Sequence, residues 1–350
     1  MKQWWEEPVA KPDEGIGVDA TTRQRQLTKP PGSLGELERL AVQLASMQKR
    51  QTPRVERICI TLFAGDHGVV EEGVSAFPQS VTGQMLRNFA SGGAAISVLA
   101  RELSATLKVI DLGLAEAIAP LQGVTHLNIA RGTANFTRKA AMTVAQFVQA
   151  MDAGHHAAHE ASIQQSDLFI GGEMGIGNST SACALASVLL QVPPGQLVGP
   201  GTGLDVGGVQ HKLGVVQTGI ELHRGCCDSP VDALTRLGGL EIAALCGSYI
   251  AAAQLGLPIL VDGYISSVAA LCATRISPGT RAWMLFGHRS AEPGHALVLQ
   301  ALDASPLLDL GMRLGEGSGA AVAVPLLRAA CALHNQMATF AEAAVSAKQS

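Results

Sequence analysis

The chain contains little charge and few aromatic residues, and these shortages exclude several classes of protein. Asp, Glu, Lys and Arg make up 15% of the 350 residues, and Phe, Trp and Tyr make up 4%. A formal net charge of −4 offers no basic surface for nucleic acid or for anionic lipid. No run of 18 apolar residues lacks a polar interruption, so we predict no membrane span. The low surface charge indicates that another subunit covers part of the protein.

Disulfides and secretion are also disfavoured. The seven cysteines are an odd number and lie mostly in apolar stretches, and the adjacent Cys226 and Cys227 lack the C-x-x-C spacing of a metal site. Free thiols in a reducing compartment explain this pattern better than disulfides do. The first residues, MKQWWEEPVAKPDE, are acidic and lack the apolar region of a signal peptide. We therefore expect a cytoplasmic protein.

Glycine, proline and small apolar residues are abundant, and short apolar runs alternate with helical patterns. Alternation of this kind predicts βαβ units around a parallel sheet. The strand-like runs are nearly all apolar, as expected when helices cover both faces. We expect strands within 57–68, 106–114, 167–173, 257–262 and 281–287. We expect helices over 33–48, 80–102, 143–165, 264–276 and 318–344, the first with a capping box of Ser33 and Glu36 and the last with a kink before Pro325.

Polar clusters rich in glycine follow four of the predicted strands, at 64–68, 171–181, 262–263 and 287–290. In an open parallel sheet, ligands bind beyond the carboxyl ends of the strands. The four clusters are therefore expected to meet at one edge of the sheet and to form a ligand site there.

The stretch GGEMGIGNSTSA follows a strand and opens a helix, which is the arrangement of an anion site at a helix N-terminus. It matches neither a Walker loop nor a G-x-G-x-x-G fingerprint, and a simple glycine turn with an Asn or Ser cap remains the alternative. Glu173, just before the turn, better suits a cationic or N–H-bearing part of a ligand. Lys212 follows a second glycine-rich loop, where it is either a solvated charge or the second half of a phosphate clamp.

Several other polar residues have either a structural or a functional interpretation. Asp66 and His67 form either a strand-end turn or part of a catalytic site. His155 and His159 have the i, i+4 spacing of metal ligands, but their stretch lacks the H-E-x-x-H pattern, so an exposed amphipathic helix is favoured. Arg289, in the 287–290 cluster, suits a structural ion pair as well as a ligand contact.

Glu316 stands alone among glycines in LGEGSG, just before an apolar run. Desolvation in such a place raises the pKa of a carboxyl towards the range of a useful proton acceptor. A charge that stabilises a helix N-terminus explains the same pattern equally well.

Several stretches together break this tie. TKPPGSLGELERLA, FAGDHGVVEEGVSAFPQSVTGQM, GEMGIGNSTSA, GGLEIAALCGSYIAAAQLGLPILVDGYISS and MRLGEGSGAAVAVPLL closely resemble the nicotinate-nucleotide–dimethylbenzimidazole phosphoribosyltransferase family, in the same order from about residue 20 to 340. The resemblance implies transfer of phosphoribose from nicotinate mononucleotide to 5,6-dimethylbenzimidazole, with inversion at C1′, in the assembly of the cobalamin nucleotide loop. Adenine and phenolic compounds remain alternative acceptors.

The resemblance also implies a fold and a set of site residues. The fold is an α/β protein with a large Rossmann-like domain, a parallel sheet flanked by helices (51–310), and a smaller helical domain from residues 1–50 and 311–350. A homodimer is implied, with no metal and no cofactor. Glu316 is the implied proton acceptor. The implied nucleotide and phosphate site comprises Glu173, Gly175, Gly177, Asn178, Ser179, Thr180, Lys212 and Ser290, and the implied base site comprises Phe77, Gln84, Met85 and Leu314. Some members of the family have Ser at the position of Phe77.

Two other functions fit the sequence less well. A kinase or ligase using the 171–181 turn predicts a lysine within the glycine loop and a metal-holding Asp pair, and the sequence has neither. A nucleotide-binding subunit without catalytic activity gives no reason for an isolated carboxylate at Glu316.

Overall fold

Six parallel strands form one sheet in a computed structural model that describes residues 3–346. The strands lie in the order β3-β2-β1-β4-β5-β6, so the chain reverses its direction of travel across the sheet between β1 and β4. Ligands bind at such a reversal in open α/β sheets. The predicted α/β class and parallel sheet are confirmed. The strands are β1 (Ile58–Gly65), β2 (Thr106–Gly113), β3 (Val124–His126), β4 (Leu168–Met174), β5 (Ile259–Val261) and β6 (Met284–Phe286).

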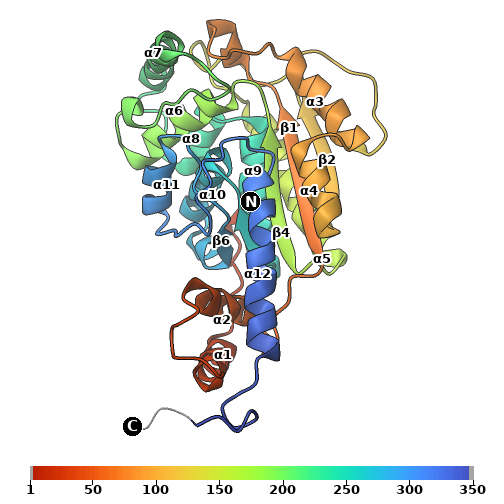
Figure 1. The fold of residues 1–350 in the computed structure, drawn as a ribbon. Helices are drawn as coiled ribbons and strands as arrows, with labels where there is room; N and C mark the ends of the chain where they lie inside the picture. Colours follow the sequence, from red (N-terminus) through yellow and green to blue (C-terminus); the bar gives the residue numbers. More distant parts are fainter. Residues whose placement is uncertain (1–2, 347–350) are drawn as a thin grey trace.

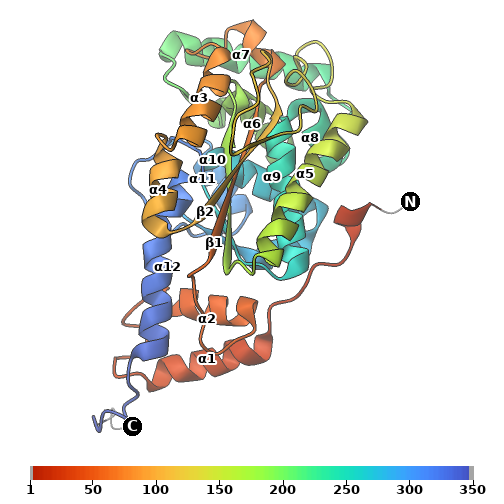
Figure 2. The same ribbon diagram turned by 90° about the vertical axis from the view of Figure 1, so that its right-hand side faces the viewer.

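Helices cover both faces of the sheet (Figures 1 and 2). The helices α3 (Ser80–Ser91), α4 (Ala95–Leu103) and α12 (Ser318–Gln336) lie on one face. On the other face are α5 (Val144–Ile163) and α9 (Leu240–Leu255), and α9 is buried along most of its length because it is apolar on every side. The remaining helices are α1 (Glu14–Gln26), α2 (Glu36–Gln48), α6 (Asn178–Leu190), α7 (Val206–Leu222), α8 (Pro230–Leu237), α10 (Tyr264–Ile276) and α11 (His295–Ala301), with short 3-10 turns at Trp4–Glu6, Gly68–Glu72, Pro194–Gln196 and Pro278–Trp283.

Helices α1 and α2 lie beyond the end of the sheet, beside the C-terminal half of α12 (Figure 1). Two helices from the first 50 residues therefore pack with the last helix here. The division into domain segments 1–50, 51–310 and 311–350 stays a prediction.

Three predictions about helix ends were wrong. Helix α2 begins at Glu36 with Gly35 at the N-cap position, so Ser33 lies two residues too early to cap it, and Glu38 rather than Glu36 accepts a backbone N–H of this turn, from Leu34 at 3.0 Å. The run 80–102 is two helices, since Gly92 at φ 82° ends α3. Helix α12 continues through Pro325 but ends at Gln336 rather than near residue 344.

Three observations concern metal sites, disulfides and membrane spans among the described residues. His155 packs at 4.3 Å, between ring centroids, against both Trp4 and His159, and residues 3–346 contain no cluster of His, Cys, Asp and Glu suited to a metal ion. All seven cysteines are free thiols, as predicted. Within this same range, no helix combines the length and the apolar character that crossing a bilayer requires.

Candidate active site

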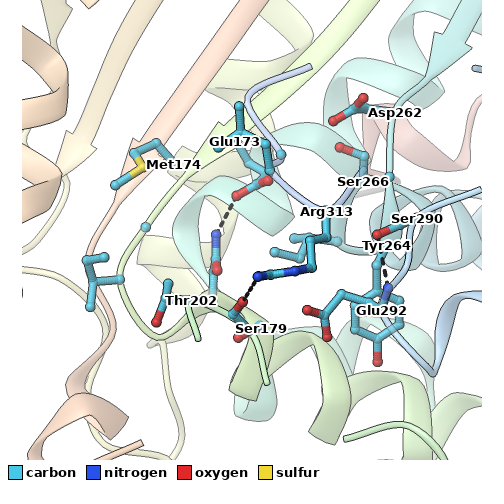
Figure 3. Close-up of a pocket in the computed structure, with 18 of the residues that line it drawn as sticks. Glu173, Met174, Ser179, Thr202, Asp262, Tyr264, Ser266, Ser290, Glu292 and Arg313 are labelled. Carbon is cyan, nitrogen blue, oxygen red and sulfur yellow. Dashed lines mark hydrogen bonds between the residues drawn. The ribbon is translucent and has the colours of Figure 1, made fainter. Parts of the chain in front are cut away.

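A cavity of about 290 Å³ opens at the carboxyl ends of β4, β5 and β6 (Figure 3). Three of the four polar clusters contribute to its wall: the turn after β4, Asp262 and Gly263 after β5, and His288 and Ser290 after β6. The loop before α12 closes one side with Arg313, Leu314 and Gly315. The prediction that strand-end clusters meet at one edge is confirmed for these three, and the fourth, at 64–68, lies beneath the wall.

The turn after β4 is shaped by its glycines. A Cβ on Gly175 would lie 2.2 Å from the carbonyl oxygen of Gly65, so only glycine fits there. Gly177, at φ 98°, starts helix α6 and leaves the first N–H groups of that helix free of a side-chain cap. Asn178 and Ser179 line the cavity, whereas Thr180 is fully buried behind them. This arrangement resembles an anion site at a helix N-terminus, although Asn178 N and Thr180 N already donate to the carbonyl oxygens of Gly175 and Gly177.

Lys212 is buried directly behind this turn, so the interpretation as a solvated surface charge was wrong. Its Nζ donates to Ser179 Oγ at 2.9 Å and to the carbonyl oxygen of Gly199 at 3.3 Å. Burial lowers the pKa of Lys212, and the nearby Glu292 partly offsets that effect. Burial raises the pKa of Glu292, with Lys212 and Arg313 acting in the opposite direction. Each of the two buried groups thus favours the charged form of the other.

Glu173 is a buried carboxyl that faces the cavity (Figure 3). Asn178 donates its side-chain amide to one carboxyl oxygen. Burial first, and then the charges of Glu241, Asp262 and Glu316, raise the pKa of Glu173 well above its ordinary value, although the backbone of Glu316 acts in the opposite direction. The surroundings therefore favour the protonated acid, which can donate a hydrogen bond to a ligand.

Glu316 lies in a loop of left-handed residues, with φ of 89°, 66° and 82° at positions 315 to 317. Asp262 holds this loop from β5, since its carboxylate accepts from Gly317 N at 3.1 Å and from Ala320 N at 2.8 Å. A Cβ on Gly172 would lie 2.4 Å from the carbonyl oxygen of Glu316, so β4 also fixes the loop. A non-glycine residue in this conformation is uncommon and persists only where its surroundings impose it.

The Glu316 side chain is buried on the α4 side of its loop. One carboxyl oxygen accepts from Ile96 N, in the first turn of α4, at 3.5 Å. No ion pair with Glu316 occurs among the described residues. Burial raises the pKa of Glu316, the Ile96 N–H lowers it, and the charge of Asp262 raises it. Leu314 and Gly315 line the cavity, but Glu316 itself is not part of the cavity wall.

The predicted base-binding residues are divided between two places. Phe77 and Leu314 line the cavity mouth, where their exposed fractions are 49% and 58%. Two large apolar side chains left this exposed beside a cavity suit an aromatic ligand. Gln84 is exposed and Met85 half-buried on α3, and neither lines the cavity.

Asp66 and His67 support the wall from beneath. His67 Nδ1 lies 3.0 Å from Ser181 Oγ, and its Nε2 lies 2.7 Å from Glu241. Asp66 accepts from Thr82 at 2.6 Å, and Thr82 in turn accepts from Ile176 N at 3.2 Å. Both residues therefore hold the 175–181 turn in place. They belong to a turn at the end of a strand, and that turn supports the wall of the candidate site.

Sequence reasoning missed His295. Its Nδ1 accepts from Ser290 N at 2.7 Å, and burial lowers its pKa to about 3. The ring is therefore neutral with its proton on Nε2, which donates to Ser267 Oγ at 2.9 Å. No short motif marks this histidine, because its role depends on a contact with α10.

Arg313, Tyr264 and Glu292 also line the cavity without having been predicted. Arg313 stands next to the LGEGSG stretch, so its position in the sequence was the available signal. Arg289, in contrast, is exposed, lies 4.0 Å from Asp309 and is not part of the wall.

Comparisons with known proteins converge on one group. Residues 9–345 match a family model described as Phosphoribosyltransferase. The chain is 60% identical, over 98% of both chains, to nicotinate-nucleotide–dimethylbenzimidazole phosphoribosyltransferases of Ectopseudomonas mendocina (strain ymp) and Pseudomonas putida KT2440. It also resembles the crystal structure of an enzyme of that name from Thermus thermophilus, with a TM-score of 0.90, 42% identity and coverage of 96% of this chain and 100% of that one.

Proposed function

The chain belongs to the phosphoribosyltransferase family, and on that premise we propose that it transfers phosphoribose from nicotinate mononucleotide to 5,6-dimethylbenzimidazole. The products are α-ribazole 5′-phosphate and nicotinate, for the cobalamin nucleotide loop. One ring nitrogen of the base attacks C1′ of the ribose, and the bond from C1′ to the nicotinate nitrogen breaks with its electron pair. The base then carries positive charge, which is lost as a proton from its second nitrogen.

Glu316 is the proposed acceptor of that proton, and its environment is the observation that carries the proposal. The carboxyl is 5% exposed, is in no ion pair among the described residues and has one long backbone contact at 3.5 Å. Its burial raises the pKa, which makes the carboxylate a stronger base than an exposed one. Attraction between this carboxylate and the base grows as positive charge develops, so it lowers the barrier more than it strengthens ground-state binding.

The acceptor base is proposed to enter between Phe77 and Leu314, towards the loop that carries Glu316. Leu314 and Gly315 form the cavity side of this loop, and Ile96 of α4 lies on its other side. Gln84 and Met85 of α3 are proposed to complete the far end of the base site. Phe77 is proposed to influence which base is preferred.

The phosphate of the nucleotide is proposed to bind at the start of α6. Gly175, Gly177, Asn178 and Ser179 supply the turn and its N–H groups, and Lys212 supplies charge from behind. The buried Thr180 supports the turn, and Ser290 approaches from β6, held by His295. Glu173, as a protonated acid, is proposed to donate to the ribose or to the leaving nicotinate. No step of this reaction requires a metal.

The direct test is the release of nicotinate from nicotinate mononucleotide, with dimethylbenzimidazole present, measured by liquid chromatography. The wild-type protein should form α-ribazole 5′-phosphate in equal amount. Glu316→Gln should fold normally and lose turnover about 100-fold or more. Glu160→Gln, an exposed carboxyl paired with Lys108, is the matched control and should turn over normally. A wild-type protein that binds nucleotide without releasing nicotinate would favour a non-catalytic subunit, and a fully active Glu316→Gln would move the acceptor elsewhere.

We also propose that the protein is a cytoplasmic homodimer, with a small helical domain built from α1, α2 and the end of α12. The low proportion of charged residues and the free thiols support this assignment. Light scattering after size exclusion should give about twice the chain mass of 36.2 kDa, and a monomer at micromolar concentration would contradict it.

A further inference from the structure

Without Arg313, the described residues around the proposed phosphate site include Lys212 behind Ser179 and three carboxyls in the cavity wall, those of Glu173, Asp262 and Glu292. Lys212 is buried behind Ser179, and Glu292 is buried in the cavity wall, where each favours the charged form of the other. Burial acts against the charged form of both groups, so Lys212 supplies at most one positive charge here. A phosphomonoester carries a charge of about −1.5 to −2 at neutral pH. Lys212 alone therefore leaves part of this negative charge uncompensated.

Arg313 is the one Arg or Lys among the cavity-lining residues that the structure describes. Its side chain extends from the loop before α12 across the cavity, so that the guanidinium points towards Ser179 (Figure 3). Nη1 donates to the carbonyl oxygen of Gly201 at 2.9 Å. A Cβ on Gly201 would lie 2.7 Å from Ser179 Oγ and 3.2 Å from Lys212 Nζ, so the Gly201 backbone directly adjoins the proposed phosphate site.

We infer that Arg313 is the second cation of this site and that it binds the 5′-phosphate of the nucleotide, an inference that rests on the proposed function. A guanidinium matches the geometry of phosphate oxygens and donates to two of them at once. Its single contact with Gly201 leaves donors free for this purpose.

The proposed contact between Arg313 and the phosphate should also position the loop that carries Glu316. Arg313 stands three residues before Glu316, in the segment that also supplies Leu314 to the cavity. A phosphate held by Arg313 draws this segment towards the start of α6. Binding of the phosphate thereby positions Leu314 and Glu316 relative to C1′ of the ribose. Binding energy from the phosphate, which does not react, is in this way used to align the reacting groups.

Binding experiments separate this role from two others. Dissociation constants of nicotinate mononucleotide, nicotinamide mononucleotide and ribose 5-phosphate are measured by calorimetry with wild-type protein, Arg313→Met and Arg313→Lys. Arg289→Met is the matched control, because Arg289 is an exposed arginine near the same edge that does not line the cavity. We expect Arg313→Met to weaken all three ligands by a similar factor, about 10- to 100-fold. Arg313→Lys should recover part of the loss, and Arg289→Met should bind normally.

Each other result overturns the inference. Loss confined to nicotinate mononucleotide would show that Arg313 binds the ring carboxylate, which nicotinamide mononucleotide lacks. Unchanged binding of all three ligands, or a wild-type protein that does not bind ribose 5-phosphate, would exclude Arg313 as a phosphate ligand. Arg313→Lys no better than Arg313→Met would remove the charge argument. Failure of the proposed function is distinguishable, because it appears as absent nicotinate release by wild-type protein whatever these constants are.

Discussion

Replacement of Asp262 should destabilise the fold far more than replacement of an ordinary capping residue, because its side chain accepts two hydrogen bonds that tie the loop of Glu316 to the sheet. Its carboxylate is 1% exposed and accepts from Gly317 N at 3.1 Å and from Ala320 N at 2.8 Å. Asp262→Ala leaves both N–H groups buried without an acceptor. Each such group costs about 1–3 kcal/mol, so the free energy of unfolding should fall by about 2–6 kcal/mol.

The matched control is Asp205→Ala at the start of α7. Asp205 caps that helix through Gly208 N at 2.8 Å, but it is exposed, so water replaces the lost acceptor. Loss of an exposed cap costs about 1 kcal/mol. Urea unfolding of both variants, followed by circular dichroism, measures the difference. Asp262→Asn keeps one acceptor oxygen and should lie between the wild-type protein and Asp262→Ala.

Activity provides the second measurement on the same variants. A freed loop no longer fixes Glu316 in its left-handed conformation, and a displacement of about 1 Å at a reacting group lowers turnover by about 100-fold. We therefore expect kcat of Asp262→Ala to fall by that order under conditions where the variant is fully folded. The reasoning fails if Asp262→Ala is destabilised no more than Asp205→Ala, or if it is destabilised and keeps its kcat.

Two further predictions concern the same loop. As pH falls, kcat/KM should decrease with an apparent pKa above the ordinary glutamate value of 4.5, because burial raises the pKa of Glu316 and protonation removes the proton acceptor. Steady-state rates between pH 4 and 8 measure this decrease. Glu316→Gln should lack it. Gly172→Ala should destabilise the fold, since its Cβ would lie 2.4 Å from the carbonyl oxygen of Glu316. Gly214→Ala, where a Cβ meets nothing within 4 Å in the middle of α7, should leave the melting temperature unchanged or raise it, and equal melting of the two variants would contradict the steric argument.

Local patterns were sufficient for the sheet and insufficient for the ends of helices. The run that became β1 is apolar apart from Thr61, and the runs that became β2 and β4 are apolar over much of their length, so their position between two layers of helices was predictable. The three-residue β3 carries no such pattern, because it is an edge strand that is only partly buried. Ser33 and Glu36 have the spacing of a capping box, but Glu38, paired with Lys29 at 2.8 Å, accepts the backbone N–H of this turn instead. That competition was not visible in the sequence.

The same division holds for the site. The sequence by itself determined that glycine turns and polar clusters follow the strands, that a lone carboxylate stands among glycines, and which family the motifs resemble, because these are properties of short contiguous stretches. Only the tertiary structure decided that Lys212 lies behind Ser179, that Asp262 holds the Glu316 loop, and that His295 orients Ser290. Each of these contacts joins residues far apart in the sequence or depends on one particular side-chain orientation, as does the reach of Arg313 to Gly201. Burial and long-range hydrogen bonds set the charge and position of these groups, and both arise only when the sheet edge brings the loops together.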